Sequence, residues 1–497
     1  MSQSDQERWQ KGEDHEGEDE ISSLCSSHHG VAAKQSLRHD MKDEPHMIAQ
    51  RDNAPPPPPN GGYGWVCTVC VGLINAHTWG LNSSYGVFLA HYLATNAFPG
   101  ASSLEFAFVG SLSISCAMLV SPLATISCRE LGLKPTLAVG IVLETASFIA
   151  ASFASKIWHL FLSQGICFGF GMGFLFVASV GVVPQWFTTR RSLANGFSTA
   201  GSGLGGLVYS LAAGAMIRNI GLPWAFRILG ILCFVVNSIC TVLIKDRNKI
   251  IGSNQLAFDS DLFTRIEYNL LLLFGFFSML GYVVLIFSLA NYANEIGLNA
   301  SQASIVSAIF NLGQGLGRPL IGYFSDNVGR INMAAGMTFL CGVFSFAIWI
   351  PASSYGVLLF FAVIGGMVAG TFWCTIAPVT AEVVGLKDVP SGLNIIWLDL
   401  VLPCTFSEPI ALEIVDGTGR YLGAQLFVGF MYIAAAMCLF VLRGWKIGEL
   451  DEIALAKAQR PEDLDSVKVE CSDAVSVRSR KVGRRKMLAE CWKWRKV

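Results

Sequence analysis

The sequence predicts an all-α integral membrane protein with twelve transmembrane helices arranged in two six-helix halves. Its composition is that of a membrane protein, because 52% of the residues are hydrophobic, only 14% are charged and the mean hydropathy is +0.49. Twelve apolar stretches each reach the length of about twenty residues that a helix needs to cross a bilayer. A polar stretch at 246–265 separates the first six from the last six.

The twelve predicted spans follow one another with short connections. Their limits are 63–90, 104–127, 133–154, 157–181, 192–217, 223–245, 266–292, 302–324, 331–352, 355–379, 391–415 and 420–442. The first half is expected to cover residues 60–245 and the second 266–442, with a cytosolic linker at 246–265 between them. Residues 1–59, which end in a proline run, and residues 443–497, which include a basic run at 478–486, are expected to be cytosolic tails, the first of them disordered.

Loop charges predict that both termini are cytosolic. Lysines and arginines gather in the loops on the side of the termini, for example at Arg190, Arg191 and Arg330, whereas the loops on the other side hold few. Asn299 then begins a glycosylation sequon in an external loop and is a candidate for modification. We expect the protein in the cell membrane, with the vacuolar membrane as the alternative.

A polar stripe runs along the eighth predicted span. Ser304, Ser307, Asn311, Gln314 and Arg318 are spaced by three or four residues, which places them on one face of a helix. An arginine inside a membrane helix costs about 3 kcal/mol on insertion scales, so its side chain usually faces protein or a water-filled cavity. We therefore predict that Arg318, Gln314 and Asn311 bind a substrate. The alternative is a structural ion pair between Arg318 and Asp399 or Glu408.

Other polar residues in the apolar spans complete the set of candidates. Asn82, Trp79 and Tyr209 are expected to form the wall of the substrate site, and His77, Asp399 and Glu408 are candidates for carrying a proton or forming an ion pair. Glycines spaced by four residues are expected to let helices pack closely. They are Gly165, Gly169 and Gly173, then Gly201 and Gly205, then Gly313 and Gly317.

Several classes of function find no support in the sequence. Most of the fourteen cysteines lie in apolar runs, which favours helix packing over a disulfide framework or a metal site. The glycine-rich stretch 201–206 lies inside a predicted membrane helix, so it is not interpreted as a nucleotide loop. No catalytic constellation, metal site or cofactor is predicted, and the expected partners are a small organic substrate and the lipid bilayer rather than nucleic acid. The oligomeric state is left open.

Two stretches resemble the signatures of the monocarboxylate transporter family. Asn60-Gly-Gly-Tyr-Gly-Trp65 resembles the first signature, and the stretch Trp186–Ser202, with Arg190 and Arg191, resembles the second. The turn from Gly322 to Arg330 looks like the general loop motif of the major facilitator superfamily, and the polyproline tail looks like the fungal branch. The resemblance implies two halves that rock around a central site, usually with an organic anion as cargo. The predicted gate and loop-motif residues are Asp326, Gly329, Arg330, Arg190 and Arg191.

The sequence departs from the family at the positions linked to proton coupling. Arg318-Pro319 matches the arginine–proline of the family, but Ser83 replaces a lysine and Gln314 replaces an aspartate. Proton-coupled lactate transport is therefore not favoured. We predict a secondary transporter for a small organic acid or amphipathic metabolite, with export of a fungal secondary metabolite as a candidate role. The alternative is uptake of a monocarboxylate or a vitamin-like molecule, and a sensor or scaffold without flux is a third hypothesis.

Overall fold

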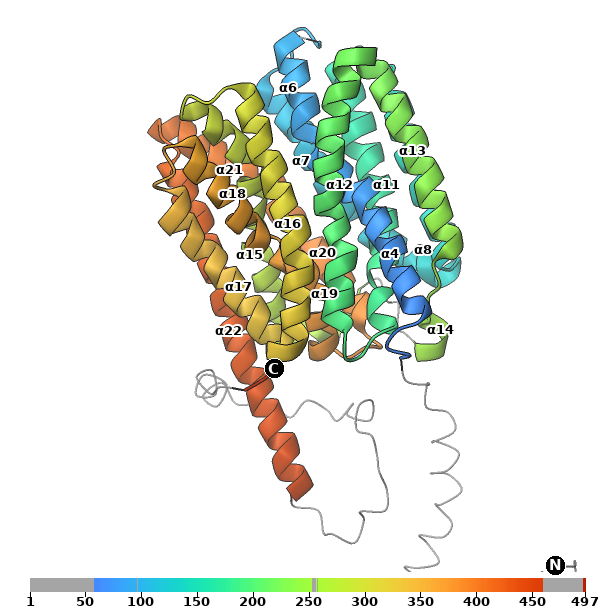
Figure 1. The fold of residues 1–497 in the computed structure, drawn as a ribbon. Coiled ribbons are helices and arrows are strands. Elements are labelled where there is room, and N and C mark those ends of the chain that lie inside the picture. Colours follow the sequence, from blue (N-terminus) through green and yellow to red (C-terminus); the bar gives the residue numbers. More distant parts are fainter. Residues whose placement is uncertain (1–57, 96, 253–255, 257, 459–494) are drawn as a thin grey trace, which may run out of the picture. The chain divides into compact units, whose positions relative to one another are not determined.

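The computed structural model describes residues 58–497 apart from 96, 253–255, 257 and 459–494. Most of the predicted N-terminal tail and the basic run at 478–486 lie outside the described residues. Helices form nearly all of the described chain (Figure 1). They are α4 (Tyr63–Asn75), η1 (Ala76–Gly80), α5 (Leu81–Ser83), α6 (Tyr85–Thr95), α7 (Ser103–Leu119), α8 (Ser121–Glu130), α9 (Leu133–Ala151), α10 (Ile157–Leu160), η2 (Phe161–Cys167), α11 (Phe168–Val180), η3 (Val183–Gln185), α12 (Arg191–Ile220), α13 (Leu222–Leu243), α14 (Asn248–Ile251), η4 (Ser260–Thr264), α15 (Ile266–Glu295), α16 (Ala300–Val328), α17 (Arg330–Phe344), η5 (Ser345–Trp349), α18 (Tyr355–Ala369), α19 (Thr371–Val383), α20 (Val389–Asp399), α21 (Val401–Thr418) and α22 (Leu422–Ala458).

Ten helical stretches in the described part of the chain are long and apolar enough to cross a membrane. The other two predicted spans are also helical, namely the first, built from α4, η1, α5 and α6, and the eighth, which is α16. These two spans carry buried polar residues, among them Asn75 and Asn82 in the first and Asn311, Gln314 and Arg318 in the eighth. These two spans are thus less apolar than the ten others and bring several polar side chains into the interior.

Several spans are interrupted in the middle. The first contains the π-helical turn η1, which adds a residue to the helical turn at Ala76–Gly80. The tenth span breaks at Gly370, between α18 and α19, and the eleventh at Leu400, between α20 and α21. Discontinuous membrane helices are characteristic of substrate sites in transporters, because they release the side chains and main chain from strict helical geometry.

The predicted glycines do hold helices at backbone contact. A Cβ atom on Gly169 would lie 2.6 Å from the Ser113 oxygen in α7, and one on Gly205 would lie 2.6 Å from the Ala76 oxygen in η1. A Cβ on Gly313 would lie 2.6 Å from the Val363 oxygen in α18. Lipid tails supply no hydrophobic drive between helices, so this close packing stabilises the bundle.

Helices α12 and α16 form the most extensive contact in the molecule, and they join the first six spans to the last six. Gly196 and Gly203 in α12 face the backbone of α16, and Gly315 and Gly322 in α16 face α12. A second contact joins α7 to α21, where Ser115 Oγ lies 2.7 Å from Thr405 Oγ1. Close approach of the two backbones at these glycines therefore characterises the interface between the halves along α12 and α16.

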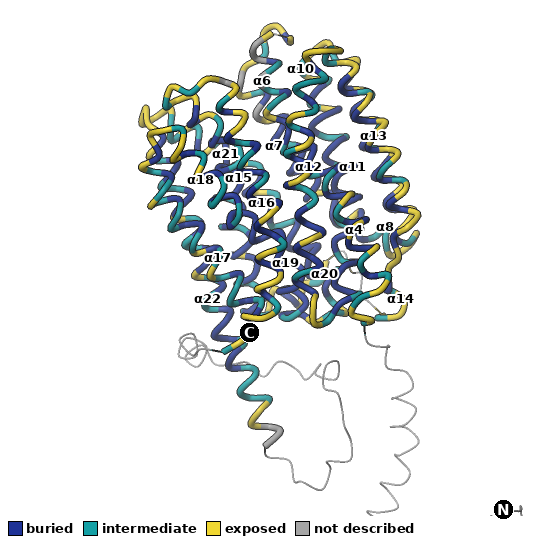
Figure 2. The backbone as a smooth tube through the Cα atoms, in the orientation of Figure 1, coloured by how far each residue is buried: buried dark blue, intermediate teal, exposed yellow. Residues whose placement is uncertain are grey.

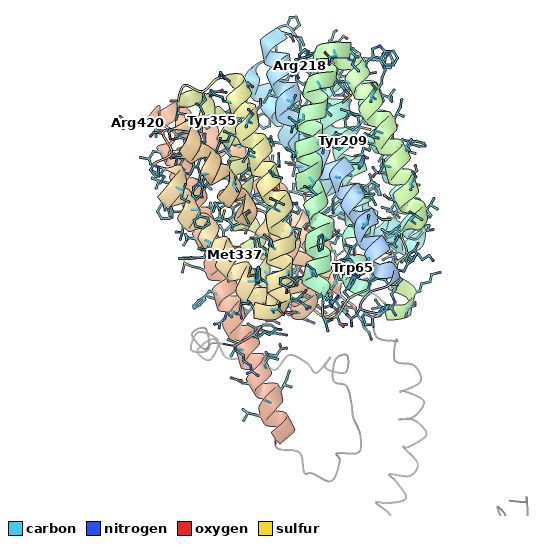
Figure 3. All side chains as sticks on the ribbon, viewed as in Figure 1. Trp65, Tyr209, Arg218, Met337, Tyr355 and Arg420 are labelled. Atoms are coloured by element: carbon cyan, nitrogen blue, oxygen red, sulfur yellow. The ribbon has the colours of Figure 1, made fainter. Side chains whose placement is uncertain are left out.

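Exposed positions occur along the outer helices, for example α13 (Figure 2). Many of the exposed residues are large and apolar. Val142, Leu211 and Val242 are 61%, 63% and 69% exposed, an arrangement that fits contact with lipid tails and not with water. Arg218 and Arg420 lie at the end of the bundle opposite Trp65 (Figure 3). The chain thus presents an apolar belt between two ends that carry charged residues.

The largest difference from the sequence-based boundaries is at the last span. Helix α22 continues to Ala458, sixteen residues beyond the predicted end at 442. The linker 246–265 contains the short helices α14 and η4. Residues Arg495–Val497 return to contact the start of α17.

Candidate transport site

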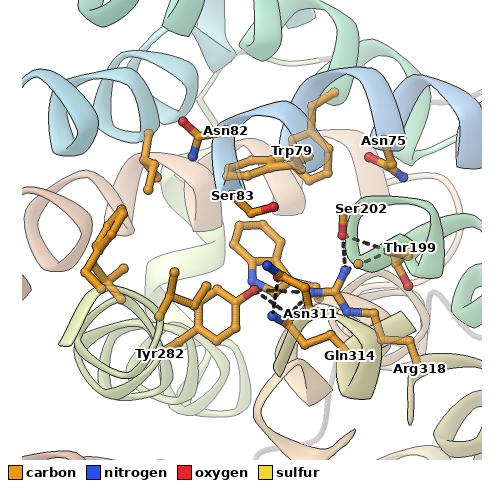
Figure 4. A pocket seen from close by; sticks show the side chains of 17 residues that line it. Asn75, Trp79, Asn82, Ser83, Thr199, Ser202, Tyr282, Asn311, Gln314 and Arg318 are labelled. Atoms are coloured by element: carbon orange, nitrogen blue, oxygen red, sulfur yellow. Dashed lines mark hydrogen bonds between the residues drawn. The ribbon is translucent and has the colours of Figure 1, made fainter. Parts of the chain in front are cut away.

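A cavity lies between the first and second halves and is lined from both (Figure 4). The cavity has room for several water molecules. The lining residues are Asn75, Trp79, Asn82, Ser83, Ile114, Phe176, Thr199, Ser202, Gly203, Tyr282, Val283, Ile286, Phe287, Asn311, Gln314, Arg318 and Trp373. Of the six predicted substrate-binding residues, five line this cavity and Tyr209 does not.

Arg318 is the centre of the polar part of the lining. Its Nη1 donates to the Thr199 main-chain oxygen at 2.7 Å and to Ser202 Oγ, both in α12. Its Nη2 donates to Gln314 Oε1 at 2.6 Å and to the Tyr282 hydroxyl at 3.2 Å. The hydroxyl of Tyr282 in turn donates to Gln314 Oε1 at 2.7 Å. The guanidinium, only 3% exposed, is therefore surrounded by neutral acceptors.

No carboxylate forms an ion pair with Arg318 among the described residues. The alternative expectation of a pair with Glu408 or Asp399 is therefore wrong for this structure. Glu408 accepts hydrogen bonds from Ser288 Oγ at 3.2 and 3.3 Å instead. Asp399 lies beside the break between α20 and α21, and its buried Oδ2 has no hydrogen-bond partner. Glu408 points elsewhere because α21 packs mainly against α15 and α7. Asp399 belongs to α20, which packs against α8, α19, α15 and α7.

Gly370 provides the room for the Arg318 side chain. A Cβ atom at this position would lie 2.7 Å from Arg318 Nε and 3.1 Å from Nη2. Gly370 lies at the break between α18 and α19 with φ −79° and ψ 9°, angles that any residue adopts. Glycine is thus needed here for space rather than for backbone freedom.

Tyr209 and His77 lie away from the cavity. Their rings contact each other edge to face with centroids 5.6 Å apart, and His77 Nδ1 lies 2.8 Å from the Leu73 oxygen. Tyr209 shares a helix face with Ser202 but lies seven residues further along α12, about 10 Å along the helix axis. The sequence spacing predicts the correct face of α12 for Tyr209 but not its position along the helix axis. The prediction that Tyr209 forms part of the cavity wall is therefore wrong.

Aromatic rings form one wall of the cavity. The Trp79 ring lies 4.8 Å from that of Trp373 and 5.3 Å from that of Phe176, measured between centroids. Trp79 and Trp373 belong to different halves, so this contact bridges them. Trp373, Phe176 and Tyr282 were not predicted. Tyr282 carries a hydroxyl near the middle of an apolar span, which is a usable signal. Trp373 and Phe176 give no such signal, because an aromatic residue in an apolar span is usually a packing residue.

The predicted gate residues contact the other half of the molecule. Asp326, near the end of α16, accepts from the main-chain nitrogens of Ser192 at 3.1 Å and Leu193 at 3.0 Å. These are orphan N–H groups in the first turn of α12, so Asp326 acts as an N-cap supplied by the other half. Its negative charge is also favourable at the positive end of the α12 dipole.

Arg330 reinforces the same contact. Its guanidinium donates to the Thr188 oxygen at 2.9 Å and to Ser192 Oγ at 3.2 Å, and it pairs with Glu382 at 2.9 Å. Gly329 has φ 112°, a conformation that requires glycine at the tight turn between α16 and α17. We call this set, Asp326, Arg330, Glu382, Thr188, Ser192 and Leu193, the gate network.

The other predicted gate residues have different roles. Arg190 is exposed, whereas Arg191 is buried and its Nε donates to the Phe187 oxygen at 3.0 Å. The related loop of the first half does not repeat the gate network, since Arg129 pairs with its exposed neighbour Glu130. There the halves meet through neutral groups, with Thr125 Oγ1 donating to Asn394 Oδ1 at 3.2 Å. The contact between the halves is thus charged at the turn between α16 and α17 and neutral where Thr125 meets Asn394.

Asn299 begins α16 and is exposed, as a modification site requires. Its side-chain oxygen accepts from the Gln302 nitrogen at 2.9 Å, and Gln302 Oε1 accepts from the Asn299 nitrogen at 3.1 Å. This reciprocal capping box gives Asn299 a structural role at the start of α16. Glycosylation stays a prediction.

A cavity between two bundles, a buried arginine within it and a charged network that closes one end define a secondary transporter. The family model of the Major Facilitator Superfamily matches residues 65–258 and 271–482. The chain belongs to this superfamily.

Relatives place it near its fungal and monocarboxylate-transporter-like members. The "Probable transporter MCH2" of Saccharomyces cerevisiae is 34% identical over 80% of this chain and 86% of its own. The "Fujikurins efflux protein" of Gibberella fujikuroi is 26% identical over 76% of this chain and 82% of its own. "Monocarboxylate transporter 10" of Rattus norvegicus is 25% identical over 78% and 79% of the two chains. The solved structure of the E. coli fucose:proton symporter FucP has the same fold, with a TM-score of 0.59 at 14% identity, over 76% of this chain and 98% of that one.

Proposed function

We propose that the cargo of this transporter is a small organic acid that carries one negative charge and an apolar body. The observation that supports this most is Arg318, a buried cation whose four hydrogen-bond partners are all neutral. A buried charge without a counter-ion is costly, and an anionic cargo would supply the missing charge. The carboxylate of the cargo would replace Gln314 Oε1 and the Tyr282 hydroxyl at Nη2.

The rest of the lining limits the cargo further. Among the described residues, no acidic side chain and no cation other than Arg318 line the cavity. An ammonium group on the cargo would therefore have no partner there, and a second carboxylate would find no second cation. Asn75, Asn82 and Asn311 offer hydrogen bonds to hydroxyl or carbonyl groups, and Trp79 Nε1 is a buried donor without a partner. Trp79, Phe176 and Trp373, together with Ile286 and Phe287, would cover an apolar body. These features favour a cargo that carries a single negative charge on an otherwise uncharged body.

Transport would proceed by alternating access of the cavity from the two sides. The gate network closes one end, and the loops there include Arg190, Arg191 and Arg330, so the positive-inside rule supports placing this end in the cytosol. Both termini would then be cytosolic, and the structure would represent a state whose cytosolic gate is closed. Opening would require Asp326 and Arg330 to release α12 while α12 slides along the glycine face of α16.

For direction we favour export, because a fungal relative that covers most of the chain is named an efflux protein. A cell membrane location fits this role, with the vacuolar membrane as the alternative. Uptake of a monocarboxylate is the second candidate, supported by the relative named monocarboxylate transporter 10. A sensor without flux is less favoured, because the gate network is complete. No catalytic role is proposed.

Purified protein titrated with benzoate and with neutral benzamide tests the cargo class. Trp79 and Trp373 line the cavity, so binding should change the tryptophan fluorescence. We expect a saturable change with benzoate and none with benzamide. Arg318→Ala should weaken benzoate binding at least tenfold, since a hydrogen bond to a charged group contributes about 1.5–3 kcal/mol. Arg318→Lys should restore little because an ammonium does not present the planar fork.

Arg420→Lys serves as the matched control, because Arg420 is exposed and lies at the opposite end of the bundle from Trp65 (Figure 3). Its binding should equal that of the wild type. Equal binding of benzoate and benzamide, or wild-type benzoate affinity in Arg318→Ala, would refute the anionic cargo.

A further inference from the structure

A segment far along the chain contacts the back of the gate loop. We use the term gate loop for Val328–Asn332, which comprises the last residue of α16, the turn residue Gly329 and the first three residues of α17. Residues Arg495–Val497 pack against it. The main-chain oxygen of Val497 accepts from the nitrogens of Ile331 at 3.1 Å and Asn332 at 3.4 Å. Both are first-turn N–H groups of α17, which otherwise lack partners within the helix.

Side chains fix the segment in the same place. Asn332 Nδ2 donates to the Arg495 oxygen at 2.7 Å, and Asn332 Oδ1 accepts from Arg443 Nε at 2.6 Å. Arg495 forms an ion pair with Asp451. The Val497 side chain is 7% exposed. Arg443 and Asp451 both belong to the part of α22 that extends beyond the predicted span, so this extension builds half of the docking groove.

The groove and the gate network share one loop. Gly329 lies directly against the Val497 backbone, because a Cβ atom on Gly329 would meet the Val497 nitrogen at 2.6 Å. The next residue, Arg330, extends its side chain to Thr188 and Ser192 in the first half. The loop is thus held by α12 through the gate network and by residues 495–497 through the groove.

This arrangement links segment docking to the gate. Arg330 reaches across to α12 only while the start of α17 keeps its position. The segment contacts α17 and α22, which both belong to the second half, so it moves with that half and does not itself bridge the two. Its effect is therefore to stiffen the loop that presents Asp326 and Arg330.

We propose that residues Arg495–Val497 act as a latch that stabilises the closed gate by docking between the start of α17 and the extension of α22. This inference rests on the proposed function, in which opening of the gate network is a step of transport. Undocking of the segment would loosen the Val328–Asn332 loop and raise the fraction of molecules whose gate is open.

Native Cys374 is a suitable reporter for gate opening. It is fully buried, and its main-chain oxygen accepts from Asn195 Nδ2 at 2.7 Å, between the cavity and the gate network. In a background whose other cysteines are replaced by serine or alanine, the rate at which N-ethylmaleimide modifies Cys374 measures opening. Asp451→Arg or Arg495→Asp should raise this rate about two- to fivefold, as expected for loss of a half-exposed ion pair.

The charge-swapped double variant, Asp451→Arg with Arg495→Asp, should return the rate to that of the wild type. Removal of residues 495–497 should raise it at least as much as the single variants. The control is the exposed Arg129–Glu130 pair, since Arg129→Glu should leave the rate unchanged. An unchanged rate after removal of the segment would overturn the latch, and a swap without recovery would overturn the role of the ion pair.

The benzoate titration separates this inference from the proposed function. If the cargo class is wrong, benzoate binding is absent in the wild type and in every latch variant. If only the latch is wrong, benzoate binding persists and depends on Arg318, while the Cys374 rate does not respond to the segment.

Discussion

At the scale of single residues, Arg318 is stabilised without an ion pair. Four neutral acceptors from α12, α15 and α16 surround it, and two of them, Tyr282 and Gln314, also bond to each other. Neutral acceptors solvate the guanidinium but leave its charge available. The resemblance implies an aspartate at the Gln314 position in lactate-carrying members of the family. Such an aspartate would compete with the anionic cargo that we propose, whereas Gln314 is neutral.

Gly370→Ala should weaken cargo binding by crowding Arg318. The new methyl group would lie 2.7 Å from Nε, so the guanidinium must shift away from its partners. We expect an affinity for benzoate reduced about threefold to tenfold, corresponding to a strain of about 1 kcal/mol, measured by the fluorescence titration.

The control is Gly181→Ala at the end of α11. Gly181 has nearly the same backbone angles, φ −76° and ψ −10°, and open space around its Cα. If both variants lost the same affinity for benzoate, the loss would come from any alanine placed at a helix end and not from crowding of the Arg318 side chain.

At the scale of helices, packing depends on close approach of backbones. Gly317 in α16 lies against Met367 in α18 so closely that a Cβ atom would clash with its main-chain oxygen. Backbone atoms have no rotamers to change, so the helices themselves would have to separate.

Gly317→Ala should therefore destabilise the protein by about 1–3 kcal/mol, as overpacking does in cores. A thermal-unfolding assay in detergent should show a lower midpoint. Gly336→Ala in α17 is the control, because nothing lies within 4 Å of the added methyl group. A midpoint that does not differ between the two variants would contradict the backbone contact.

At the scale of the whole molecule, coupling to protons depends on what the cavity contains. Ser83 and Gln314 both line it, and neither titrates. Lactate uptake driven by a proton gradient should therefore be negligible in vesicles that contain the wild-type protein.

The double variant Ser83→Lys with Gln314→Asp should create pH dependence. An aspartate at position 314 would pair with Arg318, whose Nη2 lies 2.6 Å from the present Gln314 oxygen, and would exclude an anionic cargo while it is charged. Protonation would release Arg318, so benzoate binding should rise as the pH falls. Binding in Gln314→Glu measures the effect of a longer acid, and a double variant that binds equally at pH 5 and pH 8 would refute this scheme.

Topology is tested by labelling from one side. A cysteine at Asn299, which is exposed at the start of α16, should react with an impermeant thiol reagent on intact cells that express a variant without other reactive cysteines. A cysteine at exposed Thr189, beside the gate network, should react only after permeabilisation. The opposite pattern would reverse the orientation.

The sequence by itself determined the helical membrane fold, the spans and much of the site. The apolar composition and the length of each span are set by the thickness of the bilayer, so both can be read from the sequence. The 3.6-residue period of a helix places Asn311, Gln314 and Arg318 on one face. The charged turn Asp326–Arg330 and the packing glycines were also predicted, because turns and close helix contacts have strict local requirements. These features are encoded by neighbours in the chain.

Only the tertiary structure decided which residues meet across helices. It showed that Arg318 bonds to Tyr282, Thr199 and Ser202, that Glu408 and Asp399 lie elsewhere, and that Tyr209 lies beside His77. It also placed Val497 against Gly329, across more than 160 residues of chain. Periodicity gives the direction of a side chain but not its depth or its partner on another helix, and those follow from how the twelve predicted spans pack.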